Sequence, residues 1–280
     1  MPSSAVFPVI QTLRGLHASL TGGTYTGVME IPADISIVED VASAAERAVF
    51  DPLAVAWDEI LAEPTDAPSS LSQVSLDVPV NAVYTASPED WRDQIFYSVI
   101  IDRFERASPF VAWGDPADGR TRHGGNLRGL LKRLDYIKAL GATTILINPV
   151  VMNPPAGYHQ YWAVHLMAVD PQIGTMADLK ELVATAHRMG IRVVLDMVFN
   201  HTAPIVECTE GLPFGPRKTV KRWRYPLKPV ELARDECFSL RGDIGDWHDV
   251  EQVKVGDLPG GINRFDTSRP DVQEDRKSVV

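Results

Sequence analysis

The chain has 280 residues, of which 45% are hydrophobic and 23% are charged, so it can bury one large core or two smaller ones. Its net charge of −10 disfavours nucleic acid and anionic membrane as partners, because phosphate binding needs clustered Lys and Arg. It contains neither a long apolar run nor a basic stretch ahead of an apolar core, so we expect no membrane span, no signal peptide and a cytoplasmic location.

The acidic charge is concentrated at the start of the chain. Residues 1–90 hold thirteen Asp and Glu against two Arg, whereas the remainder is close to neutral. Apolar residues at helical spacing predict two short helices in residues 31–63, and a Pro- and Ser-rich stretch predicts a linker over 63–73. Residues 74–87 can hold a short strand. We therefore expect residues 1–90 to form an acidic, partly helical N-terminal extension whose charge keeps it solvated.

From Trp91 onward, apolar strand patterns alternate with helical patterns. The predicted strands are residues 94–102, 142–150 and 191–199, and the predicted helices are residues 127–140 and 175–189. Thr175 is the expected N-cap of the second helix, with Asp178 three residues on, and Gly141 and Gly190 are expected to end the two helices. Near-continuous apolar strands separated by helices predict parallel βαβ units with both sheet faces covered.

Each predicted strand runs into polar residues at its carboxyl end. Asp102 and Arg103 end the first strand, Asn148 lies near the end of the second, and Asp196 lies within the third. In parallel α/β folds the active site gathers beyond this edge of the sheet. The sequence therefore predicts a polar pocket there. The two cysteines, Cys208 and Cys237, leave open either two thiols or one local disulfide.

Three ordered stretches carry a family resemblance. "DQIFYSVIIDRF", "HGGNLRGLLKRLDYIKALGATTILINPV" and the long run from "GYHQYW" to "VVLDMVFNH" resemble the α-amylase family, glycoside hydrolase family 13. The resemblance implies an α/β fold, an incomplete (β/α)8 TIM barrel whose first three strand-helix units occupy residues 91–202. It further implies an inserted domain over 203–262 and a lead-in to a fourth strand over 263–280.

The resemblance also implies roles for individual residues. Asp196 matches the aspartate that braces the active-site floor, and Asn200 matches a residue that often ligates a structural calcium. His201 matches an imidazole that hydrogen-bonds the sugar, and Tyr161 matches the aromatic platform under the same ring. His159 and Trp162 lie beside that platform. The substrate-binding residues that the resemblance implies are therefore Tyr161, His201, Asp196, His159 and Trp162.

The chemistry of these residue types agrees with a sugar site. Sugars present apolar CH faces and hydroxyl edges, so a pocket needs a stacking aromatic ring and fixed donors and acceptors. The expected partner is an α-glucan or malto-oligosaccharide, and Asn200 offers the oxygen that calcium prefers. Gln160 departs from the family pattern, in which a glycine is common, and we expect this to alter the floor of the loop.

Glycoside hydrolysis by a retaining enzyme needs two carboxylates about 5 to 5.5 Å apart. In the family these come from the fourth and fifth strands, and no segment after Asp271 resembles a strand bearing G-x-R-x-D. We therefore expect no catalytic residues and no activity in these 280 residues. The last six residues, "DRKSVV", back-translate to a common sequencing-library adapter, which favours the hypothesis that the natural coding sequence continues after about Glu274.

Several functions share the motifs present. The first is a retaining glycoside hydrolase acting on α-glucosidic bonds, and the second is a transglycosylase of the same family, such as a maltosyltransferase, trehalose-forming or branching enzyme. A non-catalytic carbohydrate-binding or partner subunit with the same barrel is the third. An unrelated parallel α/β protein with structural polar residues at its strand ends is the fourth. The sequence predicts no oligomeric state.

Overall fold

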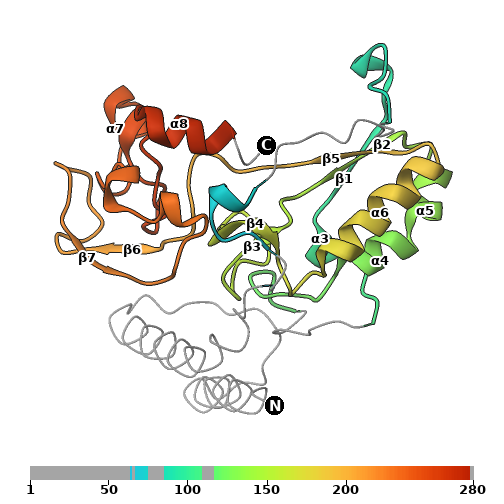
Figure 1. The fold of residues 1–280 in the computed structure, drawn as a ribbon, viewed down its shortest axis with the longest axis horizontal. Helices are drawn as coiled ribbons and strands as arrows, with labels where there is room; N and C mark the ends of the chain where they lie inside the picture. The colour runs from blue at the N-terminus through green and yellow to red at the C-terminus, as the bar shows by residue number, and fades with distance from the viewer. Residues whose placement is uncertain (1–63, 65–66, 75–84, 109–116, 278–280) are drawn as a thin grey trace, which may run out of the picture. The chain divides into compact units, whose positions relative to one another are not determined.

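The computed structural model describes residues 64, 67–74, 85–108 and 117–277, whose elements are shown in Figure 1. The two helices predicted in residues 31–63 and most of the strand predicted over 74–87 lie outside these described residues. Within the stretch predicted to be a linker, residues Leu71–Gln73 form a single 3-10 turn (η1) with a capping box from Ser70.

Three strands form one parallel sheet, as the sequence predicts. They are β1 (Phe96–Val99), β2 (Thr144–Ile147) and β5 (Arg192–Leu195), in the order β1-β2-β5. Val99 of β1 pairs with Ile147 of β2, and Ile147 pairs with Leu195 of β5. The last residues of the three strands therefore lie side by side. The loops that follow the strands therefore leave the sheet at one edge. Each strand is shorter than predicted, and β2 and β5 end directly before the polar residues Asn148 and Asp196.

The end of β1 is the clearest correction to the sequence prediction. Asp102 was predicted to lie in the strand, but it lies in the single-turn helix α3 (Ile101–Phe104). Its buried carboxylate accepts hydrogen bonds from the main-chain N–H groups of His123, at 2.9 Å, and Gly124, at 3.0 Å. These hydrogen bonds tie α3 to the loop at residues 123 and 124 and so favour a turn at Asp102 over a longer strand. The apolar pattern of the strand gives no indication of partners so far along the chain.

Helices cover one face of the sheet. The predicted helix over 127–140 is broken at Arg133 into α4 (Leu127–Lys132) and α5 (Leu134–Ala139), because the Arg133 N–H also bonds to the Leu130 carbonyl in a tighter turn. α6 (Met176–Arg188) begins with the predicted Thr175 and Asp178 capping box. Gly141 and Gly190 follow α5 and α6 with φ of 84° and 72°, which confirms the predicted glycine stops.

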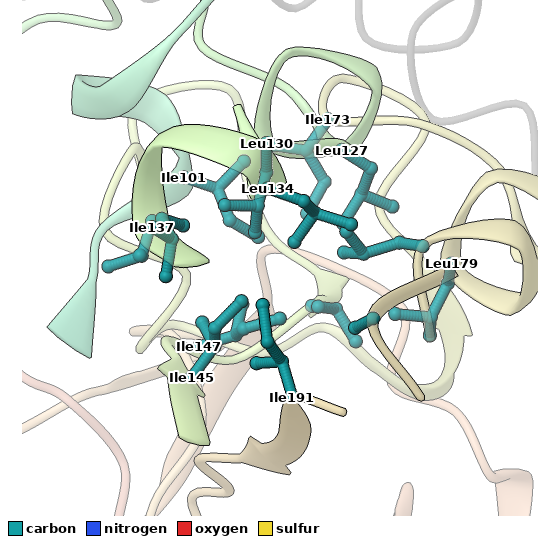
Figure 2. Packing of buried hydrophobic residues seen from close by; sticks show 14 of the residues in the cluster. Ile101, Leu127, Leu130, Leu134, Ile137, Ile145, Ile147, Ile173, Leu179 and Ile191 are labelled. Atoms are coloured by element: carbon teal, nitrogen blue, oxygen red, sulfur yellow. The ribbon is translucent and has the colours of Figure 1, made fainter. Parts of the chain in front are cut away.

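The main core lies between the sheet and these helices. Figure 2 shows isoleucines of β2 facing leucines of α4 and α6 across this layer. Its fully buried members come from every unit of the βαβ pattern, and they include Ile101, Leu127, Leu130, Leu134, Ile137, Ile145, Ile147, Leu182 and Ile191. Burial of this apolar stripe is what fixes the helices on the sheet.

The opposite face of the sheet is exposed along β1 in the residues that the structure describes. Phe96 of β1 and Ile100, which follows the strand, are 48% and 45% exposed. On the other face of the strand, Val99 belongs to the core and Tyr97 packs against it. The expectation that both faces would be covered is therefore wrong for β1, whereas Thr144 of β2, which pairs with Phe96 on that face, is fully buried. The exposed side chains are large and apolar, so this face is suited to further packing.

The remaining elements are short and lie in loops and in residues 203–277. A β-hairpin in the loop after β2 consists of β3 (Val151–Met152) and β4 (His165–Val169), and β6 (Val206–Cys208) pairs antiparallel with β7 (Val220–Trp223). The others are η2 (Trp91–Asp93), η3 (Val230–Leu232), η4 (Asp235–Cys237), α7 (Val250–Val255) and α8 (Pro270–Lys277). No disulfide joins Cys208 and Cys237. Within the described ranges, no helix has the length and apolarity needed to cross a membrane.

Candidate functional site

The candidate site lies where the loops that follow β2 and β5 meet. Asp196 directly follows β5, and its main-chain N–H donates to the Ile147 carbonyl at 2.8 Å, which extends the sheet pairing by one residue. The Tyr161 hydroxyl, from the β2 loop, donates to Asp196 Oδ2 at 2.8 Å. The sheet edge therefore fixes the carboxylate, and the carboxylate orients the tyrosine ring.

His201 approaches the same tyrosine from the β5 loop. Its Nε2 lies 3.2 Å from the Tyr161 carbonyl oxygen, and because a carbonyl only accepts, Nε2 carries the proton. The loop around His201 is held by antiparallel pairing with a distant segment: the Thr202 N–H donates to Asn263 O and the Phe265 N–H to Asn200 O, each at 3.0 Å. The structure thus brings Tyr161, Asp196 and His201 together.

His159 is the centre of an aromatic cluster in the β2 loop. Its ring stacks near Tyr161, with centroids 5.9 Å apart, and meets Trp162 edge-on at 4.6 Å. Tyr158 contacts it edge-on from the other side at 5.0 Å. The Tyr161 N–H donates to His159 Nδ1 at 3.0 Å, which leaves Nε2 of the neutral ring as the donor. All five predicted substrate-binding residues therefore belong to one connected group.

The surroundings of the group keep its histidines neutral. Burial, and next the positive charge of Arg122, lower the pKa of His159 below its usual value, and burial is also the main cause that lowers the pKa of His201. Burial, followed by the hydrogen bond to Asp196, raises the pKa of Tyr161 to about 12. At neutral pH the two imidazoles are uncharged and the tyrosine is protonated, so the group presents neutral rings beside one carboxylate.

Two of the polar residues expected at the strand ends, Asn148 and Arg103, support the site from outside the sugar-facing group. Asn148, after β2, accepts the Ile101 N–H at 2.9 Å and donates to the His159 carbonyl at 3.0 Å, so it joins the loops that follow β1 and β2. The guanidinium carbon of Arg103 lies 4.0 Å from the centroid of the Tyr158 ring, a cation–π contact. Both contacts agree with the polar pocket predicted at this edge of the sheet, although the sequence did not indicate which partners the two residues would have.

Asn200, the residue that the resemblance assigns to a calcium, lies in the loop that follows β5. Calcium takes six to eight oxygen ligands, carboxylates prominent among them. Within the part of the chain that the structure describes, no group of three or more His, Cys, Asp or Glu side chains could hold a metal ion. The Asn200 amide nitrogen instead lies 3.5 Å from His201 Nδ1, and its main-chain oxygen accepts the Phe265 N–H. The charged residue paired across from His201 is Arg264, a cation.

The sequence and the fold of the chain are both similar to those of one protein family. Residues 98–226 match the family described as alpha amylase, catalytic domain. An α-amylase of Streptomyces lividans is 34% identical over 186 residues, which cover 60% of this chain and 19% of that protein. The solved α-amylase of Geobacillus thermoleovorans, complexed with acarbose, is 29% identical with a TM-score of 0.55, and the match covers 69% of this chain and 37% of that one. The cyclomaltodextrin glucanotransferase CldA is 30% identical with a TM-score of 0.53, covering 66% of this chain and 41% of that one.

The sheet order, the helical layer and these matches define the fold class as a partial (β/α)8 barrel, of which the described residues hold three parallel strands. The chain carries part of the catalytic domain of the α-amylase family, glycoside hydrolase family 13. It spans between 15% and 37% of the length of the first curated relatives that it matches.

Proposed function

We propose that this chain is the sugar-binding part of an enzyme that acts on α-glucosidic bonds of starch-like glucans or malto-oligosaccharides, and that these 280 residues bind such a sugar without cleaving it. The observation that carries the proposal is the hydrogen-bonded contact of Tyr161 with both Asp196 and His201, at 2.8 Å and 3.2 Å. The family resemblance assigns Tyr161 and His201 to the sugar and Asp196 to the floor of the same site.

The group offers what a sugar ring needs. Its aromatic faces suit the apolar CH face of a pyranose, and Tyr161 and Trp162 are both partly exposed. Asp196 Oδ1 and His159 Nε2 have no hydrogen-bond partner among the residues that the structure describes. One is an acceptor and the other a donor, and a sugar hydroxyl can serve both. Because the histidines are neutral, binding by this group should change little between pH 7 and pH 9.

The proposal assigns no catalytic carboxylate to these residues. A retaining double displacement needs one carboxylate as nucleophile and a second as acid and base. At this edge of the described sheet the carboxylates are Asp102 and Asp196. Asp102 is buried and accepts main-chain N–H groups, and Asp196 accepts the Tyr161 hydroxyl. Both are engaged in holding the structure, which supports the proposal that neither is a catalytic carboxylate.

A transglycosylase is the second candidate within the family. The likeness to the cyclomaltodextrin glucanotransferase CldA, at 30% identity, favours it as much as the likeness to α-amylases favours a hydrolase. A non-catalytic carbohydrate-binding or partner subunit is favoured by the two engaged carboxylates. The three differ in what becomes of the bound sugar.

We also propose that the chain is cytoplasmic and binds neither nucleic acid nor membrane. The net charge of −10, which repels polyanionic partners, supports the second part of this proposal.

Calorimetric titration with maltoheptaose tests the sugar-binding role. Tyr161→Ala and His201→Ala should each weaken binding at least about tenfold, ~1.4 kcal/mol, the scale of one lost ring contact or hydrogen bond. Two matched controls, Tyr136→Ala on the exposed side of α5 and His248→Ala in an exposed loop, should leave the affinity unchanged. Cellohexaose, with β-linkages, should bind more weakly than maltoheptaose.

Equal affinity of all four variants would contradict the proposed site. A reducing-sugar assay with soluble starch tests the second half of the proposal. Release of reducing ends by the purified 280-residue chain would contradict binding without cleavage.

A further inference from the structure

A buried ion pair lies beneath the aromatic loop. Arg122 Nη2 and Asp170 Oδ2 are 3.4 Å apart, and their side chains are 2% and 0% exposed. Arg122 Nε donates to the Pro155 carbonyl at 2.7 Å, and Nη2 donates to the Gly157 carbonyl at 3.2 Å. The pair therefore holds the first half of the loop that carries the rings.

Gln160 connects this pair to the second half of the loop. Its Nε2 donates to Asp170 Oδ2 at 2.7 Å and to the Val151 carbonyl at 3.2 Å, and its Oε1 accepts from Arg122 Nη2 at 3.0 Å. The residue is 1% exposed, and both polar atoms of its side chain are satisfied. No other residue in the loop contacts both members of the ion pair through its side chain among the described hydrogen bonds.

The backbone of Gln160 adopts a conformation that glycine accepts more readily. Its φ is 65°, in the left-handed region that side chains with a Cβ rarely occupy. A glycine would relieve this strain but would leave Arg122 and Asp170 each without one hydrogen-bond partner. The side-chain hydrogen bonds of Gln160 therefore offset the cost of its left-handed backbone conformation.

The residues on both sides of Gln160 are the rings of the site. Across Gln160, the Tyr161 N–H donates to His159 Nδ1 at 3.0 Å. Asn153 holds the main chain from Gln160 to Trp162. Its Nδ2 donates to the Gln160 carbonyl at 3.2 Å, and its Oδ1 accepts the Trp162 N–H at 2.6 Å. The placement of three rings thus depends on where the Gln160 backbone is held.

We propose that Gln160 is a positioning residue of the sugar site: its amide ties the segment His159–Trp162 to the buried Arg122–Asp170 pair and so sets the orientation of the rings that meet the sugar. This inference rests on the proposed function of the same site. It assigns to Gln160 no contact with the sugar itself.

Two substitutions separate positioning from stability. Gln160→Ala removes the amide and keeps the Cβ in its strained backbone, whereas Gln160→Gly removes the amide and relieves the strain. We expect Gln160→Gly to unfold at a higher temperature than Gln160→Ala. Both should bind maltoheptaose at least tenfold more weakly than the parent chain.

The His159 ring supplies a readout that stability alone would not move. Arg122, His201 and Arg103 are the charged or titratable groups that act on it, and burial keeps its pKa below the usual value. When the loop is released in Gln160→Gly, water should reach the ring and its pKa should rise toward that of an exposed histidine. Titration of the imidazole signals by NMR, assigned with His159→Ala, measures this shift.

Gln252→Ala is the matched control. The Gln252 side chain also holds a loop, accepting the main-chain N–H groups of Gly245 at 2.9 Å and Asp246 at 3.1 Å. Its loss should lower the unfolding temperature without changing the maltoheptaose affinity or the His159 pKa. Parent-like affinity together with a parent-like His159 pKa in Gln160→Gly would overturn the inference. If the parent chain binds no maltoheptaose, the proposed function fails, and the His159 pKa alone then decides whether Gln160 positions the loop.

Discussion

Asp170→Asn is expected to be the most damaging conservative substitution in the described part of the chain. Asp170 Oδ2 accepts from the Asn153 N–H at 3.1 Å, from Gln160 Nε2 at 2.7 Å and from Arg122 Nη2 at 3.4 Å, while Oδ1 accepts the Gln172 N–H at 2.9 Å. An asparagine offers one acceptor oxygen and one donor amide in the same space. In either orientation its amide faces at least one donor, and the buried Arg122 loses its counter-charge.

The size of the effect follows from what Arg122 retains. Breaking a buried ion pair by removing one partner costs about 3–5 kcal/mol, because the remaining charge is left uncompensated. Arg122 keeps its hydrogen bonds to the carbonyls of Pro155 and Gly157 and to Gln160 Oε1, so we expect the lower end, about 3 kcal/mol of the free energy of unfolding.

Urea unfolding followed by tryptophan fluorescence measures the loss, since Trp162 lies in the affected loop. Asp90→Asn is the control, because Asp90 also pairs with an arginine, Arg92, but at the surface, where the Arg92 side chain is 90% exposed, and this change should have little effect. A loss below about 1 kcal/mol in Asp170→Asn would refute the reasoning that the buried pair anchors the loop.

Three further changes test other parts of the structure. Burial raises the pKa of Asp257 to about 6, so the folded state binds this proton more tightly than the unfolded chain does. Its contribution to stability should be present below about pH 4 and lost as the pH rises through about 6, by on the order of 3 kcal/mol, and urea unfolding across this window should show the loss in the parent chain but not in Asp257→Asn. Gly129→Ala should destabilise the fold by about 2 kcal/mol or more, as measured by thermal unfolding, because its Cβ would lie 1.9 Å from the Glu105 carbonyl oxygen and α4 would have to move. Thr175→Ala should cost about 1 kcal/mol by urea unfolding, because α6 loses the side chain that accepts the Asp178 N–H.

The parallel sheet and α6 were predictable because their signals are local. The apolar runs that form β2 and β5 are β-branched and continuous, and the capping box of α6 can be identified from Thr175 and Asp178 alone. The break at Arg133 was not predicted, because the apolar spacing continues across it. The strand predicted to reach Asp102 ended early, because the partners of Asp102 lie about twenty residues further along the chain.

The site was predictable in part for a topological reason. Tyr161 and Asp196 are 35 residues apart, but both follow parallel strands, and such strands end at one edge of a sheet. The network beneath them carried no such signal. Arg122 pairs with Asp170 across 48 residues, and the sequence shows neither their burial nor the φ of Gln160. The glutamine was recognised only as a departure from the family's glycine.

The central claim is that the rings at the ends of β2 and β5 form a single sugar-binding surface. NMR of the histidine imidazoles during titration with maltoheptaose tests it most directly. The account predicts that the signals of His159 and His201 shift together along one saturation curve, while those of His187 and His248 stay in place. Shifts confined to His187 or His248, or a saturated sugar complex in which neither His159 nor His201 moves, would contradict it.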